Sequence, residues 1–345
     1  MGGARNRDRE RNRMKAVLSK ETGGPETLVV EEVADPMPGK GQVLVKVAAC
    51  AINYPDTLII RDLYQFKPER PFSPGGEISG TIEAVGEGVT EWQVGDKVLA
   101  GVGNGGLAEK IAIDAGRLFA VPDFVDLVDA SALLMTYGTT IHGLKDRGDI
   151  KEGETVLVLG AAGGVGLSAV ELAKAYGARV IAAVSTEEKG EVARKAGADA
   201  VVIYPRAPFD KDTSKQLAKD FKDAVGANGA DIVYDIVGGD YSEPALRSIA
   251  WEGRFLVIGF PAGIAKMPLN LTLLKSCDIR GVFWGAFTAR EPERNRQHIA
   301  ELFDLWKAGK ISPLVSETYP LERAHEAIAK LENRGAVGKL VVTMD

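Results

Sequence analysis

The chain of 345 residues carries a formal net charge of −6, with 45% hydrophobic and 26% charged residues. This length suits two domains with substantial cores, and the charge favours neither nucleic acid nor a membrane as a partner. No apolar run approaches the roughly 20 residues of a membrane-spanning helix. The chain has two cysteines, Cys50 and Cys277, which is too few for a disulfide framework. We expect both to be small buried residues. So few cysteines are typical of a cytoplasmic protein.

The N-terminal part changes character after residue 13. Residues 1–13 hold five arginines and no apolar segment, which predicts a disordered extension rather than a secretory signal. A tail that binds nucleic acid is the alternative. Short apolar runs then alternate with Gly/Pro turns up to residue 120, which is typical of an antiparallel, barrel-like region. The expected strands are 28–33, 42–49, 80–85, 96–100 and 109–113, and a helical pattern follows at 129–144.

An apolar run at residues 156–159 leads directly into a glycine-rich turn at 160–166, Gly-Ala-Ala-Gly-Gly-Val-Gly. The run is typical of a central parallel strand buried on both faces. A helical pattern follows at 167–176, and its start would direct free N–H groups at the turn. This predicts a dinucleotide-binding unit. The first glycine of the usual Gly-x-Gly-x-x-Gly fingerprint is Ala161 here, so an ordinary strand-to-helix loop is the alternative.

The rest of the chain supports the dinucleotide reading. Strands alternating with helices are typical of a doubly wound parallel sheet. After the turn, strands are expected at 179–184, 200–203, 231–237 and 254–258, with a helix at 187–196. A helix at 294–307 and a last strand at 338–343 follow. We therefore expect one domain built from both chain ends and a dinucleotide domain inserted between them.

Four motifs carry a resemblance to a known family: Pro74–Gly80 (PGGEISG), Val94–Val98 (VGDKV), the turn at 160–166 and Asp235–Gly239 (DIVGG). From residue 14 on, the chain resembles the medium-chain dehydrogenase/reductase superfamily, and within it the zinc-free quinone oxidoreductase (zeta-crystallin-like) branch. The resemblance implies an α/β fold and assembly as a homodimer or homotetramer. The implied domains are a GroES-like β-barrel catalytic domain, residues 14–137 and 286–345, and a doubly wound Rossmann dinucleotide-binding domain, residues 138–285.

The residues argue against a bound metal. Zinc-dependent alcohol dehydrogenases of the superfamily hold zinc with a cysteine, the histidine of a Gly-His-Glu motif and a second cysteine. Asn53 stands where the first cysteine would be, and Gly76 stands where the histidine would be. The four-cysteine structural lobe is missing as well. No metal is expected, and a zinc alcohol dehydrogenase is disfavoured.

The end of the second parallel strand indicates which dinucleotide binds. Enzymes that prefer NAD usually place Asp or Glu there, whereas this strand runs into Ser185. In the quinone oxidoreductases that the chain resembles, a serine, a lysine and a tyrosine hold the 2′-phosphate of NADPH. Ser185, Lys189 and Tyr204 match them, and Arg334 matches an arginine of the same site. We expect NADPH, because a lysine ammonium suits a phosphate dianion.

The resemblance implies further cofactor contacts. Thr139 matches a threonine near the nicotinamide ribose and the pyrophosphate. Two backbone segments match those that contact the nicotinamide carboxamide, and an edge strand at 281–284 would pair across a dimer. The cofactor residues implied in the turn and in the other segments are Ala162, Gly163, Gly164, Val165, Val237, Ile258, Gly259, Phe260, Phe283, Trp284 and Gly285.

Hydride transfer without a metal limits the chemistry. The acceptor becomes more electron-rich during transfer, so a group must stabilise that charge and a proton must arrive. Quinones and alkenes conjugated to a carbonyl are the natural small-molecule electron acceptors. By resemblance, the catalytic residues are Asn53, which would bind cofactor or substrate, Tyr64, which would donate to the developing oxyanion, and Asp56, which would orient the loop. A half-buried packing role is the alternative for Tyr64.

Two classes of function compete. The first is a zinc-independent, NADPH-dependent oxidoreductase acting on quinones or activated alkenes, with 2-haloacrylate and enoyl-thioester reduction as alternatives of the same fold. An acyl-CoA substrate would need a basic entrance, and no basic cluster is visible in the sequence. The second is a dinucleotide-binding protein with little turnover, which would bind NADPH tightly and reduce no acceptor.

Overall fold

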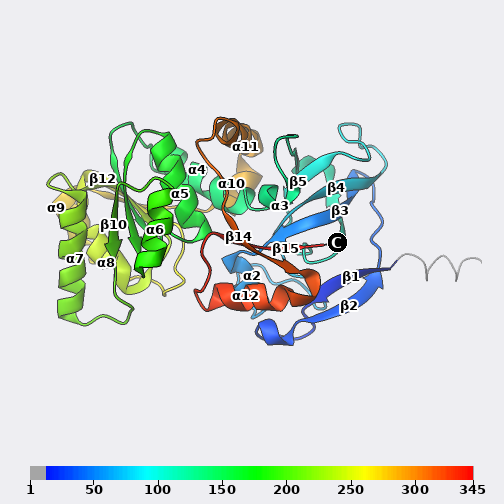
Figure 1. Ribbon diagram of the computed structural model, residues 1–345, viewed down its shortest axis with the longest axis horizontal. Coiled ribbons are helices and arrows are strands. Elements are labelled where there is room, and N and C mark those ends of the chain that lie inside the picture. Colours follow the sequence, from blue (N-terminus) through cyan, green and yellow to red (C-terminus); the bar gives the residue numbers. More distant parts are fainter. Residues whose placement is uncertain (1–12, 345) are drawn as a thin grey trace, which may run out of the picture. The chain divides into compact units, whose positions relative to one another are not determined.

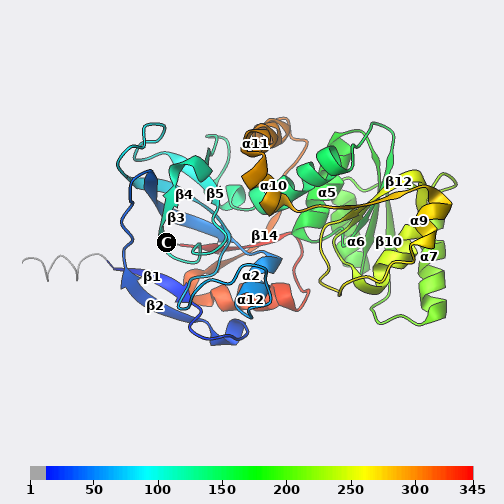
Figure 2. The ribbon, with the colours of Figure 1, turned by 180° about the vertical axis from the view of Figure 1, so that it is seen from behind.

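The computed structural model describes residues 13–344, which form two compact units (Figures 1 and 2). Unit 1 contains the residues up to Met135 and those from Pro313 on, and unit 2 contains Thr136–Ser312. The predicted extension at 1–13 lies outside the described residues, apart from Arg13, which begins a strand. Unit 2 extends past residue 285, the predicted end of the dinucleotide-binding domain, and includes helix α11 (Pro292–Lys307). Glu301 of α11 accepts a hydrogen bond from Tyr176, which also belongs to unit 2.

Unit 1 is built on a large mixed sheet in the order β14-β15-β3-β4-β5-β7, with β6 also paired to β3. Two bulges bend the long strand β3, so that its first half pairs with β6 and its end pairs with β15. A small separate sheet pairs β1 with β2. The strands are β1 (Arg13–Leu18), β2 (Val29–Ala34), β3 (Gln42–Ala51), β4 (Glu77–Val85), β5 (Lys97–Gly101), β6 (Lys110–Asp114), β7 (Leu118–Ala120), β14 (Val315–Pro320) and β15 (Lys339–Thr343).

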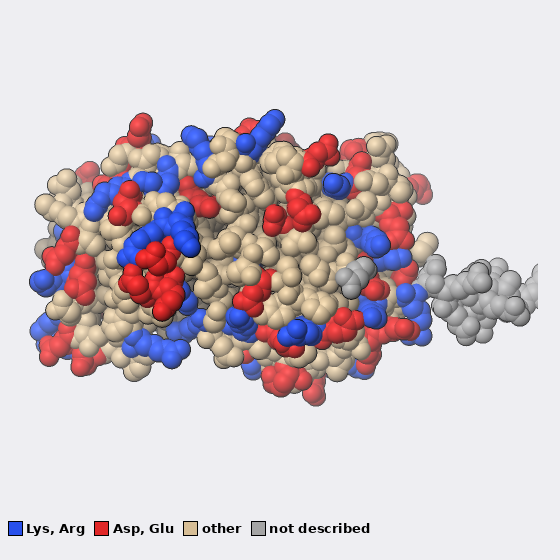
Figure 3. Space-filling view, in the orientation of Figure 1, with Lys and Arg blue, Asp and Glu red and all other residues tan. Residues whose placement is uncertain are grey.

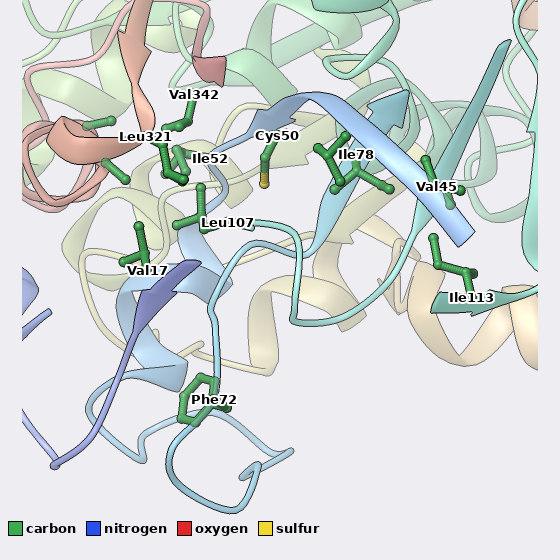
Figure 4. Packing of buried hydrophobic residues seen from close by; sticks show 14 of the residues in the cluster. Val17, Val45, Cys50, Ile52, Phe72, Ile78, Leu107, Ile113, Leu321 and Val342 are labelled. Atoms are coloured by element: carbon green, nitrogen blue, oxygen red, sulfur yellow. The ribbon is translucent and has the colours of Figure 1, made fainter. Parts of the chain in front are cut away.

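Unit 1 also contains short helices, and α3 and α12 pack against strands of this sheet. The helices are α2 (Tyr54–Ile59), α3 (Leu127–Ala130) and α12 (Ala324–Glu332), with the 3₁₀ turns η1 (Pro25–Thr27), η2 (Ala115–Arg117) and η6 (Leu321–Arg323). The core between sheet and helices is apolar and includes Cys50, whose sulfur lies among Ile52, Ile78 and Leu107 (Figure 4). Burial raises the pKa of the Cys50 thiol. Both cysteines are free and buried, which confirms the prediction made for them.

Unit 2 is built on a parallel sheet in the order β10-β9-β8-β11-β12-β13. This is the order of a doubly wound dinucleotide-binding fold, in which ligands bind at the carboxyl edge of the strands. The strands are β8 (Thr155–Leu159), β9 (Arg179–Val184), β10 (Ala200–Ile203), β11 (Ala230–Asp235), β12 (Ile249–Val257) and β13 (Asp278–Gly281). The predicted Rossmann sheet is confirmed.

Helices flank the parallel sheet, and those that cover it pack on the apolar side chains of its strands. They are α4 (Thr139–Ile141), α5 (Gly164–Ala175), α6 (Glu187–Lys195), α7 (Lys211–Val225), α8 (Ser242–Leu246), α9 (Asn270–Lys275), α10 (Trp284–Arg290) and α11, with π turns η3 (Leu134–Gly138) and η4 (His142–Arg147) and a 3₁₀ turn η5 (Gly239–Tyr241). The continuous helix expected at 129–144 was wrong, since wide π turns interrupt it.

The surface carries charges of both signs. Lys and Arg side chains lie among Asp and Glu side chains over the face shown in Figure 3. Over α6, for example, Arg194 pairs with both Glu187 and Glu191. In the described part of the chain, no helix has the length and apolar character needed to cross a membrane.

Candidate functional site

The glycine-rich turn joins β8 to α5 at the carboxyl edge of the parallel sheet. Gly160 has a φ of +71°, a conformation that glycine adopts without strain. A Cβ on Gly166 would lie 2.1 Å from the carbonyl oxygen of Gly160, so this position requires glycine. Gly163 is the N-cap of α5 and supplies no capping side chain. The first N–H groups of α5 are therefore left for an anion.

The residues of the glycine-rich turn that were predicted to bind the cofactor differ in their solvent exposure. Gly163, Gly164 and Val165 are partly exposed, so their backbone can be reached by a ligand, whereas Ala162 is buried. The Gly163 N–H donates to the Gly160 carbonyl oxygen at 3.2 Å, whereas the N–H groups of Gly164 and Val165 open helix α5. The accessible part of the turn is therefore the helix start.

A buried hydroxyl network fixes the start of α5. Thr140 Oγ1 lies 2.6 Å from Ser168 Oγ on α5 and 2.9 Å from the Tyr234 hydroxyl on β11. Ser168 also donates to the carbonyl oxygen of Val165 at 2.9 Å. Sequence reasoning selected the half-buried Thr139 and missed Thr140, because two adjacent threonines give no sign of which one is turned inward.

The residues expected at the 2′-phosphate come together where β9 and β10 end. Ser185 follows β9 and is exposed. The Tyr204 N–H donates to the Val184 carbonyl oxygen at 2.9 Å, which extends the pairing of β10 with β9 and brings Tyr204 level with Ser185. Lys189 lies in the first turn of α6, where Thr186 is the N-cap. Burial lowers the pKa of Lys189, and the charge of Arg206 lowers it further.

Two arginines, Arg334 and Arg206, differ in how they relate to these residues. Arg334 belongs to unit 1, where it follows α12 with a φ of +59°. Its part in phosphate binding stays a prediction. Arg206 was not selected from the sequence, although its charge acts on Lys189. A basic residue shortly after a predicted parallel strand was the signal that could have found it.

Asp235, at the end of β11, builds the next part of the edge. Its carboxylate accepts the N–H groups of Val237 and Gly238 at 2.8 and 2.9 Å and the Ser242 hydroxyl at 2.5 Å. Its carbonyl oxygen accepts the Ile258 N–H at 2.9 Å. One residue thus brings together two segments that the sequence analysis treated separately. The motif around residue 235 marked the segment, but not the role of the carboxylate.

The segments predicted to contact the nicotinamide, 258–260 and 283–285, differ in exposure, and the second does not form the expected strand. Gly259 is half-buried and Phe260 exposed, and Phe283 and Gly285 are exposed too. The strand expected at 281–284 was wrong, because β13 ends at Gly281 and Trp284 begins helix α10. The Trp284 ring packs against Gly138, and its indole N–H donates to Asn295 Oδ1 at 3.2 Å. Its side chain is thus fixed inside unit 2.

Unit 1 holds a separate, buried polar cluster around Asn53. The Asn53 amide nitrogen donates to Glu77 Oε2 at 2.9 Å and to the Ala51 carbonyl oxygen at 3.2 Å. Asn53 Oδ1 accepts from the Lys339 ammonium at 2.6 Å, and that ammonium lies 3.6 Å from Glu77 Oε2. Both amide hydrogens are therefore in use, and the oxygen keeps one lone pair for an outside donor. Glu77 and Lys339 were missed, because their pairing joins two distant parts of the sequence.

Asp56 and Tyr64 complete this cluster. The Asp56 carboxylate accepts the N–H groups of Asn53 and Gly75 at 2.8 and 3.1 Å, and burial raises its pKa to about 6. These bonds hold the loop before α2 against the loop before β4. Tyr64 is half-buried, and its hydroxyl forms no hydrogen bond with any residue of the described chain. Burial, followed by the charge of Asp56, raises the pKa of Tyr64.

Unit 1 does not offer a zinc site. The position that holds a histidine in the zinc-dependent enzymes is Gly76, which has no side chain to bind a metal. Asn53 supplies an amide that is bonded to Glu77 and Lys339. Within residues 13–344, no group of three or more His, Cys, Asp or Glu side chains could hold a metal ion. These residues do not fit a catalytic zinc.

The comparisons with known proteins agree with this architecture. Residues 39–123 match the family model described as "Alcohol dehydrogenase GroES-like domain", and residues 164–303 match "Zinc-binding dehydrogenase". A quinone oxidoreductase-like protein 2 homolog from Nematostella vectensis is 37% identical over 96% of this chain and 89% of its own length. The human quinone oxidoreductase is 33% identical over 96% and 98%.

Solved structures with a similar fold include quinone oxidoreductases as well. A mycobacterial protein complexed with NADPH has a TM-score of 0.87 and 35% identity over 96% of this chain and 99% of its own. The Escherichia coli quinone oxidoreductase complexed with NADPH has a TM-score of 0.85 and 29% identity over the same shares. The chain belongs to the quinone oxidoreductase family of the medium-chain dehydrogenase/reductase superfamily.

Proposed function

We propose that the chain is an NADPH-dependent oxidoreductase that transfers hydride to quinones or carbonyl-conjugated alkenes without a metal. The observation that carries this proposal is the carboxyl edge of the parallel sheet, where the glycine turn meets the start of α5 and β9 runs into Ser185 rather than a carboxylate. The family relatives solved with NADPH support the same cofactor. Bound NADPH would supply the hydride.

The chain's own residues would bind and orient. The pyrophosphate is assigned to the turn at 162–165 and Thr139, and the 2′-phosphate to Ser185, Lys189, Tyr204 and Arg334. The nicotinamide is assigned to Val237 and to the backbone at 258–260 and 283–285. The exposed edge of 163–165 and the turn held by Asp235 support these assignments.

The catalytic roles follow from the bonding in unit 1. Because both hydrogens of the Asn53 amide are already donated, Asn53 is proposed to accept from a hydroxyl of cofactor or substrate, and not to stabilise an oxyanion. Tyr64 is proposed as the donor to the acceptor's developing oxyanion, since its hydroxyl is protonated at neutral pH and has no hydrogen-bond partner within residues 13–344. Asp56 orients the loop between them.

A panel of acceptors tests the reaction class. Loss of NADPH absorbance is followed with 1,2-naphthoquinone, 1,4-benzoquinone, an alkyl enone, 2-chloroacrylate and crotonyl-CoA, all in the presence of a chelator. We expect turnover with the quinones or the enone. Turnover with 2-chloroacrylate or crotonyl-CoA alone would favour the alternative substrates. Tight NADPH binding without turnover on any acceptor would instead favour a binding protein.

The variant Lys189→Ala tests the cofactor assignment. Loss of a charged contact to the 2′-phosphate should raise the KM for NADPH about tenfold. The KM for NADH should change little, because NADH carries a hydroxyl at that position. Steady-state kinetics with both cofactors measure the two values. Equal effects on NADPH and NADH would contradict a phosphate role for Lys189.

Unit 2 also supports assembly of two copies of the chain. Strand β13 lies at the edge of the parallel sheet, where an identical strand could pair with it. Large apolar side chains beside this edge are exposed, which is unusual for a monomer. They are Ile264, Leu269, Leu273, Leu274 and Ile279. We propose a homodimer, or a homotetramer that contains this dimer, with α9 and β13 at the interface.

The variant Leu273→Glu tests this interface. Leu273 is 79% exposed, so the substitution should leave the fold of unit 2 intact and place a charge in the contact. We expect light scattering coupled to gel filtration to give half the mass of the wild-type assembly, which is a monomer if the wild type is a homodimer and a dimer if it is a homotetramer. Met37→Glu is the matched control, since Met37 is 80% exposed in unit 1. An unchanged mass for Leu273→Glu would place the interface elsewhere.

A further inference from the structure

Arg206 lies in a short segment that follows edge strand β10 and is held in place on both sides. The Tyr241 hydroxyl donates to the Pro205 carbonyl oxygen at 3.2 Å and accepts the Ala207 N–H at 3.1 Å. The ring of Tyr241 also packs against the ring of Tyr204, with centroids 4.7 Å apart. The backbone on either side of Arg206 is therefore fixed, although its side chain is exposed.

Helix α6 brings a second cation to the same place. A Cβ on Gly190 would lie 3.0 Å from Val201 and 3.7 Å from Ile203, so α6 packs closely on β10 at its second turn. Lys189 immediately precedes Gly190 and thus lies near the end of β10. The electrostatic effect of Arg206 on Lys189 agrees with this placement.

The neighbouring carboxylates are engaged elsewhere. Glu187 accepts a hydrogen bond from Arg194 at 2.6 Å, and Arg194 pairs with Glu191 as well. Glu188 accepts bonds from the Thr186 hydroxyl and from its own N–H, which lowers its pKa. Asp240 accepts the Phe209 N–H at 3.1 Å. Among residues 13–344, Arg206 itself forms no hydrogen bond or ion pair.

We propose that Arg206 is a specificity-determining residue that binds the 2′-phosphate of NADPH together with Lys189. This inference rests on the proposed NADPH site and adds a residue to it. Two cations held close together repel each other, and a phosphate dianion between them removes that repulsion. The guanidinium offers paired N–H groups that match two phosphate oxygens. The 2′-hydroxyl of NADH offers no such charge, so Arg206 favours NADPH.

The test uses fragments of the cofactor, so that binding is measured apart from turnover. Isothermal titration calorimetry gives the Kd of 2′,5′-ADP and of 5′-AMP for the wild-type chain and for Arg206→Ala. We expect Arg206→Ala to weaken 2′,5′-ADP about tenfold and to leave 5′-AMP unchanged. Arg206→Lys should recover part of the loss. Arg290→Ala, which removes an exposed arginine from α10, is the matched control and should change neither Kd.

The outcomes separate this inference from the proposed function. If the wild-type chain prefers 2′,5′-ADP and Arg206→Ala keeps the full preference, the role of Arg206 is contradicted while the NADPH site stands. If the wild-type chain does not prefer 2′,5′-ADP over 5′-AMP, the NADPH site fails and the inference fails with it. A loss of affinity for both fragments would indicate damage to the adenosine site, and would also overturn the assignment.

Discussion

Lys339→Met should lower the free energy of unfolding by about 3–5 kcal/mol, the usual effect of removing one partner of a buried ion pair. The Lys339 ammonium is buried, lies 3.6 Å from Glu77 and donates to Asn53 Oδ1 and to the Ile52 carbonyl oxygen. Methionine fills similar space but leaves the Glu77 carboxylate buried without a cation. Urea unfolding followed by fluorescence measures the change.

A second substitution shows whether charge is the cause. Lys339→Met combined with Glu77→Gln should be more stable than Lys339→Met alone, because the Glu77 carboxylate that lost its cation is replaced by a neutral amide. Lys15→Met is the control, since its ion pair with Glu322 is half exposed and contributes at most about 1 kcal/mol. Equal losses for Lys339→Met and Lys15→Met would show that the buried cluster does not stabilise unit 1.

Tyr64→Phe should reduce kcat about 100-fold, which is the lower end of the rate effects that a positioned proton donor usually contributes. The phenol is half-buried and has no hydrogen-bond partner within the described chain, so its proton is available to an acceptor. The Kd for NADPH should not change, since the variant removes only the hydroxyl. Stopped-flow measurement of a single turnover separates the hydride step from product release.

Tyr54→Phe is the matched control for this variant. Tyr54 is the first residue of α2 and is exposed, and it has no assigned role in the reaction. It should retain the wild-type kcat. If Tyr64→Phe also retains it, Tyr64 is a packing residue of the core, and the oxyanion is stabilised by a different donor.

The Rossmann sheet could be predicted from local pattern. The strands expected at 179–184 and 200–203 agree with β9 and β10. Buried parallel strands read as short continuous apolar runs, so their bounds are visible without tertiary information. By contrast, β14 lies at the end of its sheet and has three exposed residues, and only Tyr319 of the strand is buried. Its sequence, VSETYP, did not indicate a strand.

The misses at the candidate site have a common physical origin. An apolar run at 282–284 favoured a strand, but the ring of Trp284 packs against Gly138, a residue far away in sequence. The ion pair of Glu77 with Lys339 likewise joins β4 to β15. Such contacts depend on tertiary packing, and the local sequence does not contain them. Motifs located the segments of the site, whereas the bonds that hold them required the structure.

The most direct test of the account compares the two cofactors in one reaction. The ratio of kcat/KM for NADPH to that for NADH is measured with 1,2-naphthoquinone, after dialysis against a chelator. We expect rapid oxidation that survives the chelator and a clear preference for NADPH. Activity that disappears with the chelator and returns with added zinc, or a preference for NADH, would contradict it.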